Sequence, residues 1–474
     1  MKWFMLNLLL IAGIFLTAYA GELDLPKVTR YGLNMRFLLK EHRVRVDAAL
    51  TIRNVSQSSH QEIPLLLYRL LSVQHVTDAL GSPLRFDQNV VQLSDEPSLQ
   101  VRAVVVKPPK PLLPNDTLKM TISYEGFIFG YAEAMAYVRD KIDETFSLLR
   151  PDAFAYPMLA HATYSSYSAA YDTKFTYEIL ATVPKGYTAE CGGELINSSS
   201  AGPDSTIFVF RSKVPTWRID LAVAQFSVLR DSPSKLKVYH LAGDSLGARH
   251  VLTASRKVVN LYSEMFGRPA GYQGYTVIEI PDGWGSQASD FYFLQTAAAF
   301  KDSSKIGEVY HEIGHSWNVT GSPSVKRCRY FDEAFASFFE SLAIRSFEGE
   351  RRFEEDMESS RAIFVQWANY DRKVFDTPIA EYGKKELGRH SYTKGAWSLY
   401  VLNQIVGDKI FAQVIRSMLA EFQDKTIDFA GFQKLCERTS KKSLKKYFDE
   451  WIHGTESSKL LVDGVSITDI VKRY

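Results

Sequence analysis

The chain has 474 residues, of which 46% are hydrophobic and 23% are charged, and its formal net charge is +2. This composition is typical of a globular protein of two or three domains and excludes a disordered or fibrous chain. The nearly balanced charge gives no reason to expect nucleic acid as a partner. The one basic run, at 441–446, is interpreted as the solvated face of a helix.

The first twenty residues have the pattern of an export signal. Lys2 precedes an almost wholly apolar stretch at 3–16, and Ala-Tyr-Ala at 18–20 has the small-x-small form of a cleavage site. A retained membrane anchor is the alternative, but the apolar stretch is shorter than the roughly 20 residues that a span needs. We therefore expect cleavage after Ala20, no stable membrane insertion of the mature chain, and a periplasmic or secreted location.

Residues 21–232 are predicted to form a β domain. Apolar and polar residues alternate in four segments that turn-rich stretches separate, namely 44–52, 118–124, 175–183 and 207–210. Strands that follow one another without intervening helices predict an antiparallel saddle-shaped sheet or sandwich.

Beyond residue 232, strands and helices mix. The periodicity predicts strands at 235–240 and 275–280, and helices at 249–266, 304–317, 333–347, 352–370, 393–406, 409–422, 429–440 and 444–452. We expect a mixed sheet-and-helix domain over 233–404 and a short helical region over 405–474. The predicted fold class is therefore α+β and multidomain.

Three cysteines, Cys191, Cys328 and Cys436, are too few for a disulfide framework, and their spacing does not fit a zinc knuckle. They are interpreted as buried small hydrophobic side chains. Whether two of them pair is left open.

An HExxH motif at 311–315 lies within the helix predicted at 304–317. Residues four apart on a helix lie on the same face, so His311 and His315 can both reach one zinc ion. Glu312 beside them can hold the attacking water. The alternative is a pair of core histidines beside surface acids, but a second helix that begins with acidic residues favours the metal site.

A hydrolytic zinc site needs a third protein ligand, and Glu333 is the candidate. Zinc in such a site acidifies water and polarises a substrate carbonyl, with Glu312 as the general base. Histidine ligands usually donate their other N–H to an acceptor. Candidate acceptors for these bonds are Asp332, Glu308 and Glu340.

At these residues the chain resembles the gluzincin aminopeptidases, of the membrane alanyl aminopeptidase and leukotriene hydrolase type. Asp332-Glu333-Ala334-Phe335-Ala336 is similar to the acidic segment that follows HExxH in this family, although the intervening stretch, 316–332, is one residue shorter here. The segment 391–396 (Ser-Tyr-Thr-Lys-Gly-Ala) and the Phe-x-x-Trp at 448–451 also resemble family segments.

The resemblance implies an N-terminal saddle domain, a thermolysin-like catalytic domain, one zinc ion and a peptide or protein substrate. It also implies that Tyr392 donates a hydrogen bond to the oxyanion that forms during hydrolysis, and that His311, His315 and Glu333 bind zinc. From the length given, we expect no counterpart of the large helical end domain of the full-length enzymes.

One segment departs from the family pattern. The Gly-x-Met-Glu-Asn strand, whose glutamate binds the substrate's free amino group, corresponds to Gly285, Ser286, Gln287, Ala288 and Ser289. Ala288 replaces that glutamate, and an ammonium group without a carboxylate is poorly compensated. Substitutes for the missing carboxylate are sought among nearby acids, namely Glu279, Asp282 and Asp290.

Three functions follow from the sequence as hypotheses. The first is an exported zinc metallopeptidase of aminopeptidase type. The second is an endopeptidase on the same fold, since without an amine anchor a longer chain could thread the cleft. The third is a peptide-binding scaffold without catalysis, against which the intact His311, Glu312, His315, Glu333 and Tyr392 argue. Oligomeric state and side-chain preference are not predicted.

Overall fold

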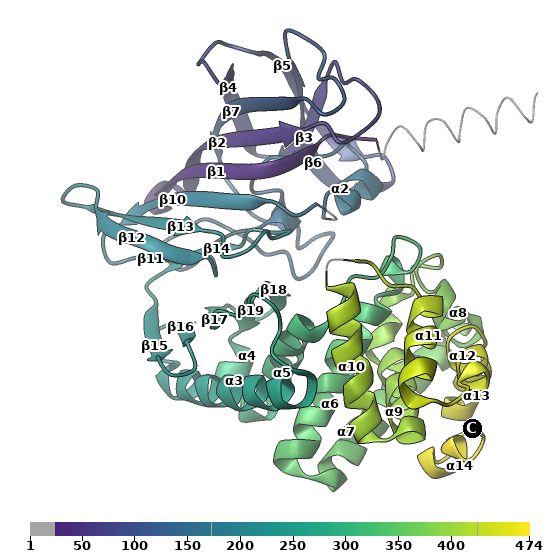
Figure 1. Ribbon diagram of the computed structural model, residues 1–474. Coiled ribbons are helices and arrows are strands. Elements are labelled where there is room, and N and C mark those ends of the chain that lie inside the picture. The colour runs from purple at the N-terminus through teal and green to yellow at the C-terminus, as the bar shows by residue number, and fades with distance from the viewer. Residues whose placement is uncertain (1–23, 172, 424) are drawn as a thin grey trace, which may run out of the picture. The chain divides into compact units, whose positions relative to one another are not determined.

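The computed structural model describes residues 24–171, 173–423 and 425–474 (Figure 1). The predicted export signal at 1–20 lies outside these residues. Within them, no helix combines the length and apolar character needed to cross a bilayer. The chain divides into two compact units. One ends at residue 228 and adds 239–243 and 278–285, and the other comprises 229–238, 244–277 and 286–474. The division into 21–232, 233–404 and 405–474 stays a prediction.

A seven-stranded sheet is the main element of the first unit. All four segments predicted from alternation are strands, and in β2 every second residue is buried, from Val44 to Ile52. The strand order is β12-β13-β10-β1-β2-β7-β4. The strands are β1 (Lys27–Leu38), β2 (Arg43–Arg53), β4 (Leu71–Asp78), β7 (Thr117–Gly126), β10 (Thr176–Pro184), β12 (Glu194–Ser200) and β13 (Ser205–Arg211).

The pairing of β1 with β10 is parallel, which corrects the expectation of a wholly antiparallel sheet. The other pairings in this sheet are antiparallel. β10 enters the sheet after more than a hundred residues of intervening chain, so no tight hairpin imposes an antiparallel direction on it. Alternation reports the face of a strand, whereas the direction of its neighbour depends on the connection.

Two smaller sheets complete the first unit. One has the order β5-β6-β3-β9, with β3 (Ile63–Tyr68), β5 (Arg85–Leu93), β6 (Glu96–Lys107) and β9 (Met158–Leu159). The other has the order β11-β14-β8, with β8 (Ser147–Leu149), β11 (Thr188–Glu190) and β14 (Leu221–Ala224), and a short helix α2 (Tyr164–Ala170) lies between β9 and β10. Side chains of all three sheets share one core, as expected for a sandwich.

The helix with the HExxH motif packs against a five-stranded sheet. Its order is β15-β16-β17-β19-β18, with β15 (Ser227–Asp231), β16 (Leu236–His240), β17 (Tyr275–Ile280), β18 (Gln287–Ser289) and β19 (Tyr292–Thr296). Two tyrosines hold the motif helix α5 (Gly307–Gly314) in place: Tyr275 on β17 donates to the Ile313 carbonyl at 3.4 Å, and Tyr262 on α3 (Ser245–Phe266) donates to the Tyr310 carbonyl at 3.2 Å.

The rest of the second unit is helical (Figure 1). The helices are α4 (Ala298–Lys301), α6 (Phe335–Glu348), α7 (Glu350–Tyr370), α8 (Arg372–Asp376), α9 (Lys394–Val406), α10 (Asp408–Phe422), α11 (Phe429–Ser440), α12 (Lys445–Trp451), α13 (Glu456–Val462) and α14 (Ile467–Val471). The long predicted helices are confirmed to within a few residues. Buried side chains from α3 through α14 form a single core, so the helices beyond 404 share the core of the motif helix.

Candidate metal centre

The two histidines of the motif lie at the end of one helix. His311 and Glu312 belong to α5, and His315 begins a 3₁₀ turn that runs to Trp317. The buried side of this segment includes Val309, Ile313 and Trp317, which are each 0% exposed. This apolar anchor turns the opposite face, with both imidazoles, away from the core.

Glu333 lies in a π-helical turn. The turn spans Tyr330–Ala334 and continues directly into α6. Arg329 precedes it with φ of 55°, a left-handed conformation that a non-glycine side chain rarely adopts. Such π turns are common at functional sites, because they shift one side chain relative to a regular helix. The sequence pattern predicted a helix start at Glu333 and did not predict this turn.

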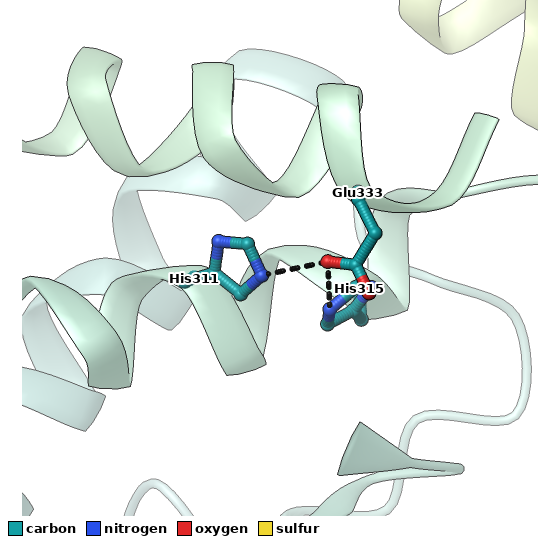
Figure 2. Close-up of side chains that lie close together, drawn as sticks. All are labelled: His311, His315 and Glu333. Carbon is teal, nitrogen blue, oxygen red and sulfur yellow. Dashed lines mark hydrogen bonds and ion pairs between the residues drawn. The ribbon is translucent and has the colours of Figure 1, made fainter. Parts of the chain in front are cut away.

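Figure 2 shows that the three predicted ligands converge. Glu333 Oε2 lies 3.1 Å from His311 Nε2 and 3.6 Å from His315 Nε2. One ligand atom from each residue lies within 4.8 Å of the others. Two imidazole nitrogens and a carboxylate oxygen are the donor set that zinc prefers, so these residues fit one zinc ion.

The second nitrogen of each histidine faces its own carboxylate. His311 Nδ1 lies 3.3 Å from Glu340 Oε2, and His315 Nδ1 lies 2.9 Å from Asp332 Oδ1. This pairing leaves both Nε2 atoms for a metal, which is the usual orientation of zinc-binding histidines. Gly307 allows the approach of Glu340, because a Cβ at position 307 would lie 2.5 Å from Glu340 Oε1.

Glu308, the third candidate acceptor, does not contact either imidazole. Its Oε2 accepts hydrogen bonds from Gln295 Nε2 at 3.0 Å and from Thr296 Oγ1 at 3.3 Å. The spacing of three residues to His311 was correct for a shared helix face, but the side chain turns towards the end of β19.

The charges around the histidines favour a cation. Burial alone would lower the pKa of His311, but hydrogen bonds to Glu333 and Glu340 raise it well above its usual value. For His315 the opposing effect comes mainly from Asp332, and its pKa is also raised. The same contacts hold the pKa of Glu333 below its ordinary range despite its burial. Three carboxylates around two imidazoles therefore compensate a positive charge placed between them.

Arg329 is a residue of this site that sequence reasoning missed. Its guanidinium forms an ion pair with Glu333, lies 3.4 Å from Asp332 Oδ2, and sits 5.7 Å from the centre of the Tyr392 ring. Its position four residues before Glu333 was the available signal, since an i, i+4 pair on a helical turn is in reach.

Glu312 and Tyr392 flank the cluster. Glu312 is 8% exposed, and its Oε2 has no hydrogen-bond partner among the described residues. Burial raises the pKa of Glu312 to about 7, against the opposing effect of the two histidines. The Tyr392 ring stacks on the His311 ring with a centroid distance of 5.6 Å and is 37% exposed. Burial of its hydroxyl and the nearby Glu333 raise the pKa of Tyr392, so it stays protonated.

The segment predicted to bind substrate lies beside the motif helix only in part. Gln287, Ala288 and Ser289 form β18, a half-buried edge strand paired with β19. Gly285 has φ of 70°, and Ser286 Oγ accepts from the Thr296 amide at 3.1 Å. Ala288 therefore offers no charge at this edge.

Of the three acids considered as substitutes for the glutamate missing at 288, Glu279 is fully buried and accepts from the Leu241 amide at 2.7 Å. This bond directs Glu279 towards the end of the neighbouring strand β16. Asp282 and Asp290 both have polar contacts of their own.

The segment that holds the candidate metal centre matches a known family domain in comparisons with other proteins. Residues 290–451 match the Peptidase family M1 domain. Human glutamyl aminopeptidase is 24% identical over 316 residues, which are 62% of this chain and 33% of that protein. Leucine aminopeptidase 2 of Aspergillus terreus is 24% identical over 55% of this chain and 44% of its own length. The chain thus spans less than half the length of these relatives.

Among solved structures, the M1 zinc metallopeptidase of Deinococcus radiodurans has the same fold. It superposes with a TM-score of 0.66 at 17% identity, over 93% of this chain and 95% of that chain. A variant of that metallopeptidase is described with a bound Tyr-Ser-Ala substrate. The predicted fold class is confirmed by this match.

Proposed function

We propose that this chain, which belongs to the gluzincin aminopeptidases and carries a Peptidase family M1 domain, is an exported zinc peptidase that removes residues from the amino ends of peptides. The observation that carries the proposal is the convergence of His311, His315 and Glu333 beside Glu312 and Tyr392. The pattern at residues 1–20 supports export, and the aminopeptidase relatives support action at amino ends.

Each of these residues has a distinct part in the reaction. His311, His315 and Glu333 would hold zinc, which when bound polarises a peptide carbonyl and acidifies water. Glu312 accepts the proton of the attacking water at Oε2 and returns it to the leaving amine. A pKa of about 7 suits both steps, because the group gains and loses a proton near neutral pH.

Tyr392 stabilises the negative charge that develops on the substrate carbonyl oxygen. Its hydroxyl keeps its proton at neutral pH and donates a hydrogen bond to the oxyanion that develops on the carbonyl. Stacking on His311 orients the phenol ring, and the Arg329 guanidinium covers that ring. The donor is thus positioned before substrate arrives, so little reorganisation is needed during the reaction.

An endopeptidase is the second candidate, and Ala288 favours it. This residue offers no carboxylate for a free amino group at the edge strand. A longer peptide with a blocked amino end would then bind as well as one with a free end.

The test uses purified mature protein, zinc analysis and two sets of substrates. The proposal predicts one zinc per chain, hydrolysis of amino-acid arylamides, and no cleavage of peptides with acetylated amino ends. Cleavage of the acetylated peptides would instead establish the endopeptidase. Glu312→Gln should lower kcat by at least about a hundredfold with zinc retained, whereas Glu354→Gln, at an exposed residue of α7, should not change it. Unchanged activity in Glu312→Gln would contradict the mechanism.

A further inference from the structure

Glu308 lies on the same helix face as the metal ligands but has no part in holding them. It precedes His311 by three residues and Glu312 by four on α5. Residues at these spacings are neighbours on one face of a helix. The face that presents His311 and Glu312 therefore continues, one turn towards the N-terminus, with a third functional side chain.

The Glu308 carboxylate is held in place by neutral donors. Gln295 Nε2 and Thr296 Oγ1 both donate to its Oε2, and Gln295 Nε2 also lies 3.2 Å from Ser286 Oγ. No lysine, arginine or histidine within the described parts of the chain forms an ion pair with Glu308, and its Oε1 accepts no hydrogen bond there. The carboxylate is half-buried, so water compensates its charge only in part.

Gln295, which donates to Glu308, has a buried acceptor of its own. Its side chain is 0% exposed, and its Oε1 has no hydrogen-bond partner in the described chain. Because a carboxylate can only accept, the amide atom facing Glu308 must be the nitrogen, and this assigns the oxygen to the other side. A buried acceptor without a donor is unfavourable by about 1–3 kcal/mol, so a donor is needed here.

A half-buried carboxylate that has only neutral donors among the described residues suits a cation that carries several N–H groups. An ammonium group has three donors and a guanidinium five. Glu308 and Gln295 lie next to β18, the edge strand that contains Ala288. Glu308 thus places a negative charge near the strand where Ala288 offers none.

We propose that Glu308, positioned by Gln295, binds a cationic group of the substrate and so determines which peptides the enzyme selects. This inference rests on the proposed peptidase function. The chemistry is that of an ammonium or guanidinium, which a peptide can present either as its free amino end or as a lysine or arginine side chain. Alternatively, Glu308 only connects α5 to β19 through its hydrogen bonds, and then it does not increase the affinity of the protein for a cationic ligand.

The affinities of four amino-acid amides for the zinc-loaded protein, measured by calorimetry, distinguish these cases. Lysinamide carries both charges, norleucinamide only the α-ammonium, α-N-acetyl-lysinamide only the side-chain ammonium, and N-acetyl-norleucinamide neither. The variants are Glu308→Gln and, as a control, Glu354→Gln.

We expect lysinamide and one of the two singly charged amides to lose roughly ten- to a hundredfold in affinity in Glu308→Gln, as for the loss of one charge-assisted hydrogen bond. The neutral amide should bind equally to wild type and variant. Loss for both amides with a free α-amine assigns Glu308 to the amino end, and loss for both lysine amides assigns it to a basic side chain. Equal affinity of all four amides in wild type and variant would overturn the proposal, as would an equal loss for all four. Since binding needs no turnover, a protein that binds these cations but hydrolyses nothing would refute only the proposed peptidase function.

Discussion

Lys394 is a buried lysine that has no carboxylate partner among the described residues, and replacing it with methionine should change how stability depends on pH. The side chain is 0% exposed at the start of α9. Its Nζ donates to Ser458 Oγ at 2.9 Å and lies 5.8 Å from the ring centres of Phe364 and Tyr382. Neutral oxygens and rings compensate the charge incompletely, and burial lowers the pKa of Lys394 from its usual 10.5 to about 7.

The sign follows from proton binding in the two states. Below pH 7 the lysine is protonated in both the folded and the unfolded chain, so it adds no slope to the pH dependence of stability. Between about pH 7 and 10.5 the unfolded chain binds one more proton, and stability rises with pH. Integration from pH 7 to pH 9 gives a gain of about 2 kcal/mol in the free energy of unfolding.

Urea unfolding of wild type and Lys394→Met, measured between pH 6 and pH 9, tests this value. The fully buried Trp317, Trp397 and Trp451 make tryptophan fluorescence report on the unit that holds Lys394. The stability of Lys394→Met minus that of wild type should fall by about 2 kcal/mol from pH 7 to pH 9. Lys409→Met, at an exposed lysine of α10, should show no such change. A constant difference across this pH range would mean that Lys394 has the same pKa in the folded and the unfolded chain.

The remaining predictions concern the metal centre and the first unit. Tyr392→Phe should lower kcat by about 10²–10³ with little change in KM or zinc content, and steady-state kinetics would contradict the oxyanion role if kcat were unchanged. Arg329→Met removes the ion pair that orients Glu333, so competition with a chelator should show zinc affinity about 10–100-fold weaker. Arg150→Met leaves the fully buried Asp140 without its charge partner and should lower the free energy of unfolding by about 3–5 kcal/mol in denaturant titrations. Equal stability of wild type and that variant would mean that Asp140 becomes protonated at little cost.

Local spacing was enough to predict the long helices, several of the strands and the cluster of three candidate metal ligands. The alternation in β2 and the helical period of α3 each depend on one face of one element, and both elements lie where the sequence predicts them. His311 and His315 are four residues apart, so a single turn of chain places them together. Glu333 was predicted because an acidic segment opens the next helix.

Contacts between distant segments could not be read from such patterns. The parallel pairing of β1 and β10 joins strands separated by most of the first unit. Only the tertiary structure shows which of the three predicted acceptors contact a histidine. Asp332 and Glu340 face imidazoles, whereas Glu308 faces Gln295, because helix periodicity specifies a face but not the rotamer or the neighbour across it.

Short segments of the chain indicate which residues can bind zinc and on which helices they lie, because ligand chemistry and helical spacing are local properties. How these residues are charged and supported depends on tertiary packing. The position of the Arg329 guanidinium over the Tyr392 ring and the burial of Lys394 beside Ser458 both arise where segments far apart in the chain pack together. Burial and the distances between charges, which determine each pKa, exist only after that packing.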